Sequence, residues 1–171
     1  MNNDKEHTLN IKNIDDRKTF EETRLIPALK CMYCGIFGKD TPVITGSTSL
    51  YIQGIYLYDF PTDIDIKFQE EKKDYNKFII YSNIIRKFGF TIDWTVANLV
   101  NKKQIKEIEY NGINILVEDA DYIINELNPL YIEHYSETKP KKVEKKYKQM
   151  KHIKENYPEH FFDKNEKYYK K

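Results

Sequence analysis

Cysteine is almost absent from this chain of 171 residues. Cys31 and Cys34 are the only two, and a pair separated by two residues does not make the disulfide framework of a small secreted domain. The pair matches half of a zinc site, but no second pair follows it. We therefore expect both cysteines to be small packing residues on a helix.

Long apolar runs are also missing. No stretch of about 18 or more apolar residues exists, so no segment is expected to cross a membrane as a helix. The first ten residues, MNNDKEHTLN, are polar and of mixed charge, unlike a signal peptide. These absences favour a cytoplasmic protein with no membrane partner.

An excess of charge of either sign is absent as well. The chain has 28 basic and 27 acidic residues, a net charge of +1, and its 40% of apolar residues suffices for a core. The balance conceals an asymmetry, because residues 139–171 hold 12 lysines against five acidic residues. The other 138 residues hold 16 basic and 22 acidic residues, so an acidic body carries a basic C-terminal extension.

The length suits one domain with a few appended elements. We expect a polar lead-in over residues 1–14, a compact domain over 15–130 and a basic helical extension over 131–171. Helices are predicted over residues 15–37, 47–54, 75–88, 119–127 and 138–157, and strands over residues 41–45, 63–68, 90–96, 105–110 and 113–117. This order predicts an α/β or α+β fold with a mixed central sheet flanked by helices and a basic helix at its C-terminal end.

Local signals refine these elements. Pro27 is expected to divide the first helical stretch into two helices, because proline breaks a helix interior and is tolerated in a first turn. In the helix over residues 75–88, Ile79 and Ile85 are expected to face the core, and Gly89 to end the helix. The pair Asn111-Gly112 is the strongest short-range signal for a β-hairpin.

The strand DIDIKF carries two carboxylates. Asp63 and Asp65 share one face of it, while Ile64 and Ile66 fill the other and anchor it in the core. Adjacent carboxylates repel each other unless a cation lies between them, and oxygen-only sites suit Mg²⁺ or Mn²⁺. Lys67 lies on the same face, where it either reaches a phosphate or pairs with a neighbouring charge.

Thr45-Gly46-Ser47 lies at the junction of a predicted strand and a short helix. Helix N-termini bind phosphate through free backbone N–H groups, and glycine lets the backbone approach a ligand closely. Ser47 adds a hydroxyl donor, and Ser49 is a further candidate. The plainer interpretation of Gly-Ser after a strand is an ordinary turn.

A third carboxylate would complete a site for two metal ions. Asp93, between Ile92 and Trp94, supplies it if its predicted strand lies beside the strand of Asp63 and Asp65. Glu118 and Asp119 are rival candidates for the same position, and the sequence alone leaves the choice among the three acids open.

Taken in order, these motifs resemble the DNA polymerase beta-like nucleotidyltransferase superfamily, above all its minimal single-domain members of the antitoxin and abortive-infection types. The residues that carry the resemblance are Ile44-Thr45-Gly46-Ser47, Asp63-Ile64-Asp65-Ile66 and Ile92-Asp93-Trp94. Residues 111–127 also resemble the strand and helix that follow the catalytic core, so the likeness covers roughly residues 27–127. The 15 residues between Ser47 and Asp63 are slightly more than is usual in the family.

The resemblance implies transfer of a nucleoside monophosphate from a nucleoside triphosphate, most often ATP, to a hydroxyl acceptor, with release of pyrophosphate. It assigns Asp63 and Asp65 to two Mg²⁺ or Mn²⁺ ions. Asp93 would bind the catalytic ion and help deprotonate the acceptor, and Gly46 and Ser47 would hold the β- and γ-phosphates. A transfer RNA end, a protein hydroxyl and a small hydroxylated molecule all remain possible acceptors.

Two questions stay open at this stage. The alternative to an enzyme is a binding module of the same fold, for example an antitoxin that covers a toxin. Residues 139–154, which hold eight lysines, form either a solvated helix docked through Val143, Tyr147 and Met150 or a surface that contacts RNA.

Overall fold

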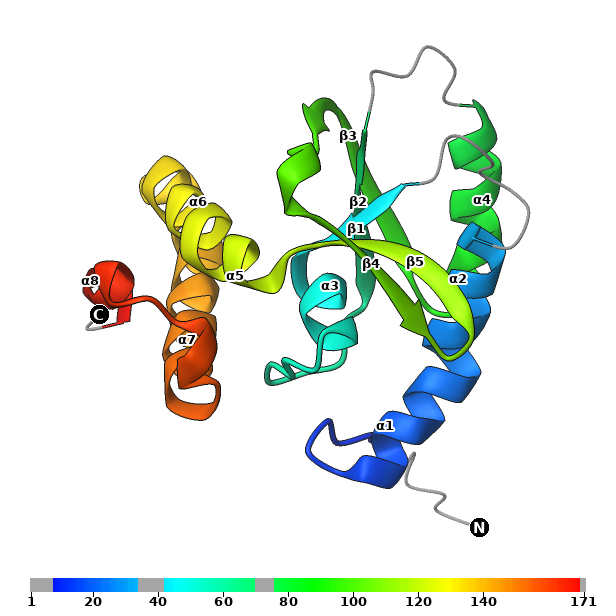
Figure 1. Ribbon diagram of the computed structural model, residues 1–171, viewed down its shortest axis with the longest axis horizontal. Coiled ribbons are helices and arrows are strands. Elements are labelled where there is room, and N and C mark those ends of the chain that lie inside the picture. The colour runs from blue at the N-terminus through cyan, green and yellow to red at the C-terminus, as the bar shows by residue number, and fades with distance from the viewer. Residues whose placement is uncertain (1–7, 34–41, 70–75, 170–171) are drawn as a thin grey trace, which may run out of the picture.

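The computed structural model describes residues 8–33, 42–69 and 76–169 of the chain (Figure 1). The strands are β1 (Val43–Thr45), β2 (Asp63–Phe68), β3 (Thr91–Leu99), β4 (Ile105–Tyr110) and β5 (Ile113–Glu118). The α-helices are α1 (Ile14–Phe20), α2 (Ile26–Tyr33), α3 (Gly46–Ile52), α4 (Asn76–Arg86), α5 (Ala120–Tyr122), α6 (Asn128–Tyr135), α7 (Pro140–Asn156) and α8 (Glu166–Tyr169). Two π-helical segments, η1 (Glu21–Leu25) and η4 (Ile123–Leu127), and three 3₁₀ turns, η3 (Lys102–Gln104), η5 (Pro158–His160) and η6 (Asp163–Asn165), complete the described elements.

The strands form one mixed sheet in the order β3-β2-β1-β5-β4. β1 pairs antiparallel with β2 and parallel with β5, β2 pairs parallel with β3, and β4 pairs antiparallel with β5. Helices α1, α2 and α4 lie together on one side of the sheet, and α5 to α8 form a separate group (Figure 1). The predicted mixed sheet flanked by helices is therefore confirmed.

The alternation predicted for β2 is present in the structure. Ile64, Ile66 and Phe68 are buried, whereas Asp63, Asp65 and Lys67 are partly exposed. The hairpin prediction is also confirmed, because Tyr110 pairs with Ile113 across a two-residue turn. Asn111 and Gly112 both have positive φ values, 49° and 76°, as a type I′ turn requires.

Pro27 lies in the first turn of α2, as predicted, but no break separates α2 from α1. The helical run continues from Ile14 to Tyr33, and η1 directly precedes the proline-containing turn. The N–H of Ile26 donates to Glu21 O, five residues back, so the widened turn accommodates a residue that has no N–H and crowds the carbonyl four residues before it.

Pro129 repeats this arrangement at the second residue of α6. Here η4 precedes the proline, and the N–H of Asn128 donates to Ile123 O. The helix predicted over 119–127 therefore does not end there but continues as α6 to Tyr135. Residue 130, expected as a domain boundary, falls inside α6.

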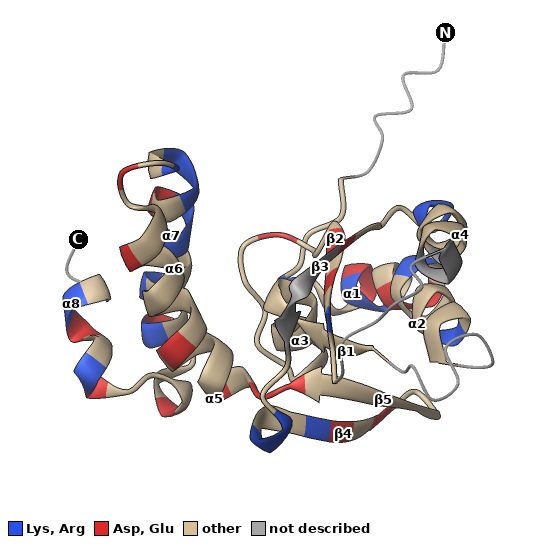
Figure 2. Cartoon of the chain, turned by 90° about the horizontal axis from the view of Figure 1, so that it is seen from above, with Lys and Arg blue, Asp and Glu red and all other residues tan. Residues whose placement is uncertain are grey.

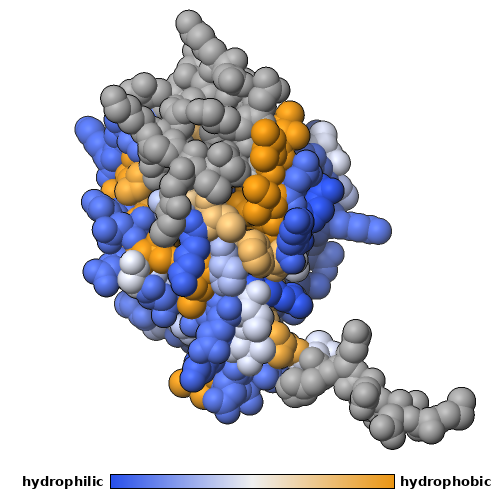
Figure 3. All heavy atoms as spheres, turned by 90° about the vertical axis from the view of Figure 1, so that its right-hand side faces the viewer, coloured by the Kyte–Doolittle hydropathy of each residue, from blue (hydrophilic) through white to orange (hydrophobic). Residues whose placement is uncertain are grey.

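Ile79 was expected to face the core, and this prediction is wrong. The Ile79 side chain is 54% exposed, whereas Ile85 is fully buried and Gly89 follows the helix with a φ of +86°. Six residues turn a helix by about 600°, which puts Ile79 about 120° away from Ile85 around α4. Figure 3 shows apolar side chains reaching the surface on this side of the molecule.

Two apolar clusters form the core. The first joins the inner face of the sheet to α1, α2 and α4, and Cys31 packs against it as expected, while Cys34 lies outside the described residues. The second joins α5 to α8 with Leu50, Ile55 and Leu57, which belong to α3 and the segment after it. Among the described residues, no helix has both the length and the apolar character needed to cross a membrane.

Residues of the two segments expected to flank the compact domain are also packed. Ile11, in the expected lead-in, is 3% exposed and belongs to the first cluster, and Asn13 caps α1 by accepting from the N–H groups of Asp15 and Asp16. At the other end, α7 buries Val143, Met150 and Ile153 in the second cluster. The basic helix is therefore a packed part of the molecule.

Candidate active site

Three carboxylates meet on neighbouring strands. In the parallel pairing of β2 with β3, Asp65 lies opposite Asp93, and Asp63 is two residues before Asp65 on the same face. One carboxylate oxygen from each of Asp63, Asp65 and Asp93 lies within 4.8 Å of the others. The structure thus brings together the three acids that the sequence singled out.

The rival acids serve other contacts. Glu118 is completely buried, accepts a hydrogen bond from the Thr45 hydroxyl and forms an ion pair with Lys67, whose Nζ lies 3.0 Å from Oε1. Asp119 caps α5 by accepting from Tyr122 N at 3.1 Å and pairs with Lys106. Neither acid belongs to the three-carboxylate cluster, and Lys67 has a charge partner on β5.

The cluster carries unbalanced negative charge. Burial, together with the charges of Asp63 and Asp93, raises the pKa of Asp65 from 3.8 to about 6, although Lys146 and Lys67 partly offset the shift. A proton or a cation relieves this repulsion. Three hard oxygen donors suit Mg²⁺ or Mn²⁺, so these residues fit the divalent ions that the sequence predicts.

Gly46 is required by the cluster itself. Its φ is +66°, a region that favours glycine, and a Cβ at this position would collide with Asp65 Oδ2. The sequence reasoning explained this glycine by approach to a phosphate. The structure adds a different cause, which is the close approach of the β1–α3 junction to a carboxylate.

The two serines of the junction differ in position. Ser47 is partly exposed and lines the cleft described below. Ser49 is fully buried, and its hydroxyl donates to Glu118 O at 2.8 Å while accepting from Gln53 Nε2 at 2.9 Å. Ser49 therefore fixes α3 to the end of β5 and does not face the cleft. Thr48 adds a second tie, donating to Asp63 O at 2.7 Å.

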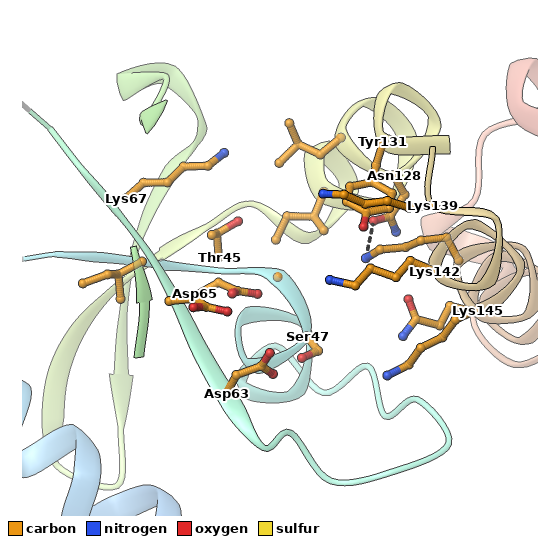
Figure 4. Close-up of a pocket in the computed structure, with 17 residues that line it drawn as sticks. Thr45, Ser47, Asp63, Asp65, Lys67, Asn128, Tyr131, Lys139, Lys142 and Lys145 are labelled. Carbon is orange, nitrogen blue, oxygen red and sulfur yellow. Dashed lines mark hydrogen bonds between the residues drawn. The ribbon is translucent and has the colours of Figure 1, made fainter. Parts of the chain in front are cut away.

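A cleft of about 630 Å³ lies between the sheet and the helical group, within the usual size of small-molecule sites. Asp63, Asp65 and Asp93 lie on one wall, beside Gly46 and Ser47. The opposite wall holds Lys139, Lys142, Lys145 and Lys146 from the start of α7. In the close-up, Lys139, Lys142 and Lys145 extend toward the strand that carries Asp63 and Asp65 (Figure 4).

Helix α7 presents two faces. Val143 and Met150 are buried and Tyr147 packs partly buried beside them, so the predicted docking seam is confirmed. Lysines concentrate along α7, while β2 carries acidic residues (Figure 2). The sequence did not show that one set of these lysines faces the carboxylates. The available signal was the spacing of Lys139, Lys142 and Lys146, three and four residues apart, which puts them on one side of a helix.

Residues from η4 and α6 complete the cleft, and the sequence reasoning missed all of them. Ile123, Leu127 and Tyr131 recur every four residues on one side of the helical run, and Asn128 lies beside them.

The chain was compared with protein-family models, with curated proteins and with solved structures, and none of them matches.

Proposed function

We propose that the chain is a metal-dependent nucleotidyltransferase of the DNA polymerase beta-like superfamily, which moves a nucleoside monophosphate from a nucleoside triphosphate to a hydroxyl acceptor and releases pyrophosphate. One observation carries the proposal: a carboxylate cluster and a row of lysines face each other across a single cleft. Carboxylates alone suit a cation and lysines alone suit an anion. The two walls together suit a polyphosphate that arrives with divalent ions.

The apolar residues of the cleft favour a nucleotide as the ligand over a polyphosphate without a nucleoside. Ile123, Leu127 and Tyr131 form an apolar strip beside the lysines, with an aromatic ring at one end. Bases stack on aromatic side chains with little regard to sequence. A base on this strip and phosphates between the charged walls would use the whole length of the cleft.

Each charged group then has a task. Divalent ions held by Asp63, Asp65 and Asp93 supply neutralisation of the phosphate charge and activation of the acceptor hydroxyl. Asp93, the exposed member of the cluster, accepts the proton of that hydroxyl. Ser47 and the lysines of α7 hold the phosphates in place, and this positioning supplies much of the rate gain.

The test is a transfer assay with an open choice of acceptor. The protein is incubated with Mg²⁺, each of four labelled nucleoside triphosphates in turn, and a cell extract. We expect label to pass to one fraction, whether transfer RNA, protein or small molecules. A protein that binds a nucleoside triphosphate but transfers label to no fraction would contradict the enzyme and favour the binding module.

A further inference from the structure

Lys146 differs from the other lysines of the cleft. Lys139, Lys142 and Lys145 are exposed, whereas Lys146 is partly buried and its Nζ donates to Asn128 Oδ1 at 3.1 Å, the bond dashed in Figure 4. Its Nζ also lies 5.6 Å from the centre of the Tyr131 ring, within the range of a cation–π contact. Burial lowers the pKa of Lys146, while Asp65 and Asp63 act in the opposite direction.

The partner of Lys146 is neutral, and this matters for its charge. Lys67 lies in the same cleft but donates to both carboxylate oxygens of Glu118, at 3.0 and 3.1 Å, so its charge is balanced within the fold. An amide oxygen accepts one hydrogen bond from Lys146 and leaves the ammonium its full charge and two further donors. Lys146 is thus fixed in place without being neutralised.

Asn128 is itself held firmly. Its side chain is 3% exposed, and its Nδ2 contacts Met150 Sδ at 3.8 Å, which ties it to the buried side of α7. Asn128 is the first residue of α6, directly after η4, and its own N–H completes the widened turn by donating to Ile123 O. The π-helical segment that accommodates Pro129 therefore also places the Asn128 amide at the cleft.

We propose that Asn128 is a positioning residue, which holds Lys146 as a charged donor for the phosphates of the bound nucleotide. The proposal rests on the proposed function, since it takes the phosphate chain to lie between α7 and the carboxylates. Ordering a lysine in advance removes an entropic cost that binding would otherwise include, which is worth about fivefold in affinity.

The experiment measures binding of inorganic tripolyphosphate with Mg²⁺ by calorimetry, in full-length variants shown to be folded by circular dichroism. Lys146→Gln is expected to weaken binding about tenfold or more, through loss of a charged hydrogen bond. Asn128→Leu is expected to weaken it about fivefold. Because both changes act through one ammonium group, the double variant should bind about as weakly as Lys146→Gln alone.

Asn128→Asp provides a variant of the same size. A carboxylate at this position would pair with Lys146 and balance its charge, so binding is expected to weaken at least as much as in Asn128→Leu. The matched control is Lys148→Gln, which removes one positive charge from the outer face of α7, where Lys148 pairs with Glu144 at 2.9 Å. The control is expected to stay within about twofold of wild type, since exposed ion pairs contribute little.

The outcomes separate the two proposals. Additive losses in the double variant, or normal binding by Asn128→Asp, would overturn the role of Asn128 and leave the proposed function standing. A wild-type protein that binds neither tripolyphosphate nor any nucleoside triphosphate would overturn both. An increase in the KM for the nucleoside triphosphate in Asn128→Asp, without an increase in the control Lys148→Gln, would support the positioning role.

Discussion

Asp65 lies at the centre of the carboxylate cluster and interacts with several other residues of the cleft. Gly46 leaves room for its carboxylate, Asp93 lies opposite it on β3, and its pKa responds to charges on both walls. Its neighbours on β2 are Ile64 and Ile66, both buried, so the strand holds the carboxylate in position from the core side. A change at this one side chain should therefore alter stability and activity in opposite directions.

Asp65→Asn is expected to keep the fold, to raise the unfolding free energy at pH 7 by about 1–2 kcal/mol and to lower transfer at least roughly 10³-fold, about 4 kcal/mol of transition-state stabilisation. The amide removes a repulsive charge but also one of the three proposed metal ligands. Urea unfolding and the labelled-nucleotide assay measure the two effects. Asp59→Asn makes the same chemical change at an exposed loop position and should alter neither. Activity of Asp65→Asn within tenfold of wild type would refute the metal site.

The pH dependence of stability follows from the same residue. The pKa of Asp65 is about 6 in the folded protein, against 3.8 ordinarily, so the folded state favours the protonated form. Without divalent ions, ionisation of Asp65 should therefore cost stability as the pH rises from about 4 to above 6, by at most about 3 kcal/mol. The measurement is the difference in unfolding free energy between wild type and Asp65→Asn across this range. This difference removes the pH dependence that both proteins share through their other carboxylates. Mg²⁺ should reduce the difference above pH 6, and a difference independent of pH would contradict the prediction.

At the scale of elements, α7 combines docking with charge. Its apolar seam holds it on the second cluster, and the lysines beside that seam are thereby fixed in direction, some toward the carboxylates and others toward solvent. A set of lysine changes chosen without regard to direction would mix the two groups. Variants restricted to one face test the cleft separately from the general charge of the helix.

Lys142→Gln with Lys145→Gln is expected to weaken binding of a nucleoside triphosphate with Mg²⁺ about tenfold or more, because both side chains line the cleft. Lys141→Gln with Lys151→Gln removes the same charge from exposed positions outside the cleft lining and should stay within about twofold. Titration of each double variant with the nucleotide at two salt concentrations measures these affinities. If RNA is the acceptor, loss of the pair that contacts it should reduce the steepness of log RNA affinity against log salt concentration by about 1.5 units. Equal losses of nucleotide affinity in both pairs would show that only net charge matters.

The elements that the sequence predicted well are those determined by local patterns. Alternation along DIDIKF fixed the faces of β2, and Asn111-Gly112 fixed the hairpin, because a period of two and a pair of positive φ values are properties of a few adjacent residues. The position of Pro27 in a first helical turn was predicted, but the π segment that joins α1 to α2 was not, since a widened turn has no marker in composition. Local rules on helix breaking assume a regular α-helix on both sides of the proline.

The site was predictable in the same measure. Asp63 and Asp65 follow from one strand, and Asp93 required only that two strands be adjacent. The pairing of Lys67 with Glu118 joins residues 51 apart, and that of Lys146 with Asn128 joins residues 18 apart on different helices. No local pattern encodes such contacts, because the first depends on the order of the strands in the sheet and the second on the packing of α6 against α7.

At the scale of the whole molecule, the cleft lies where two cores meet. The first cluster supports the carboxylates from beneath the sheet, and the second supports the lysines from beneath α7. Leu50, Ile55 and Leu57 join the second cluster to α3 and the segment after it. The position of the lysine wall relative to the carboxylates therefore depends on this contact. A ligand bound in the cleft contacts both units and should stabilise them together, by about 2.7 kcal/mol at a concentration 100 times its Kd.

Ile153→Ala and Ile85→Ala test this arrangement with matched changes. Both side chains are fully buried, Ile153 in the second cluster and Ile85 in the first, and each change is expected to cost about 2–5 kcal/mol. Only Ile153→Ala loosens α7, so only this variant should bind a nucleoside triphosphate with Mg²⁺ more weakly, in proportion to the fraction of molecules in which α7 is docked. Melting temperatures with and without nucleotide, together with calorimetric affinities, measure the two effects. If both variants lost stability and affinity equally, the two clusters would form one cooperative unit. Unchanged affinity in Ile153→Ala would mean that the phosphates do not depend on the lysine wall.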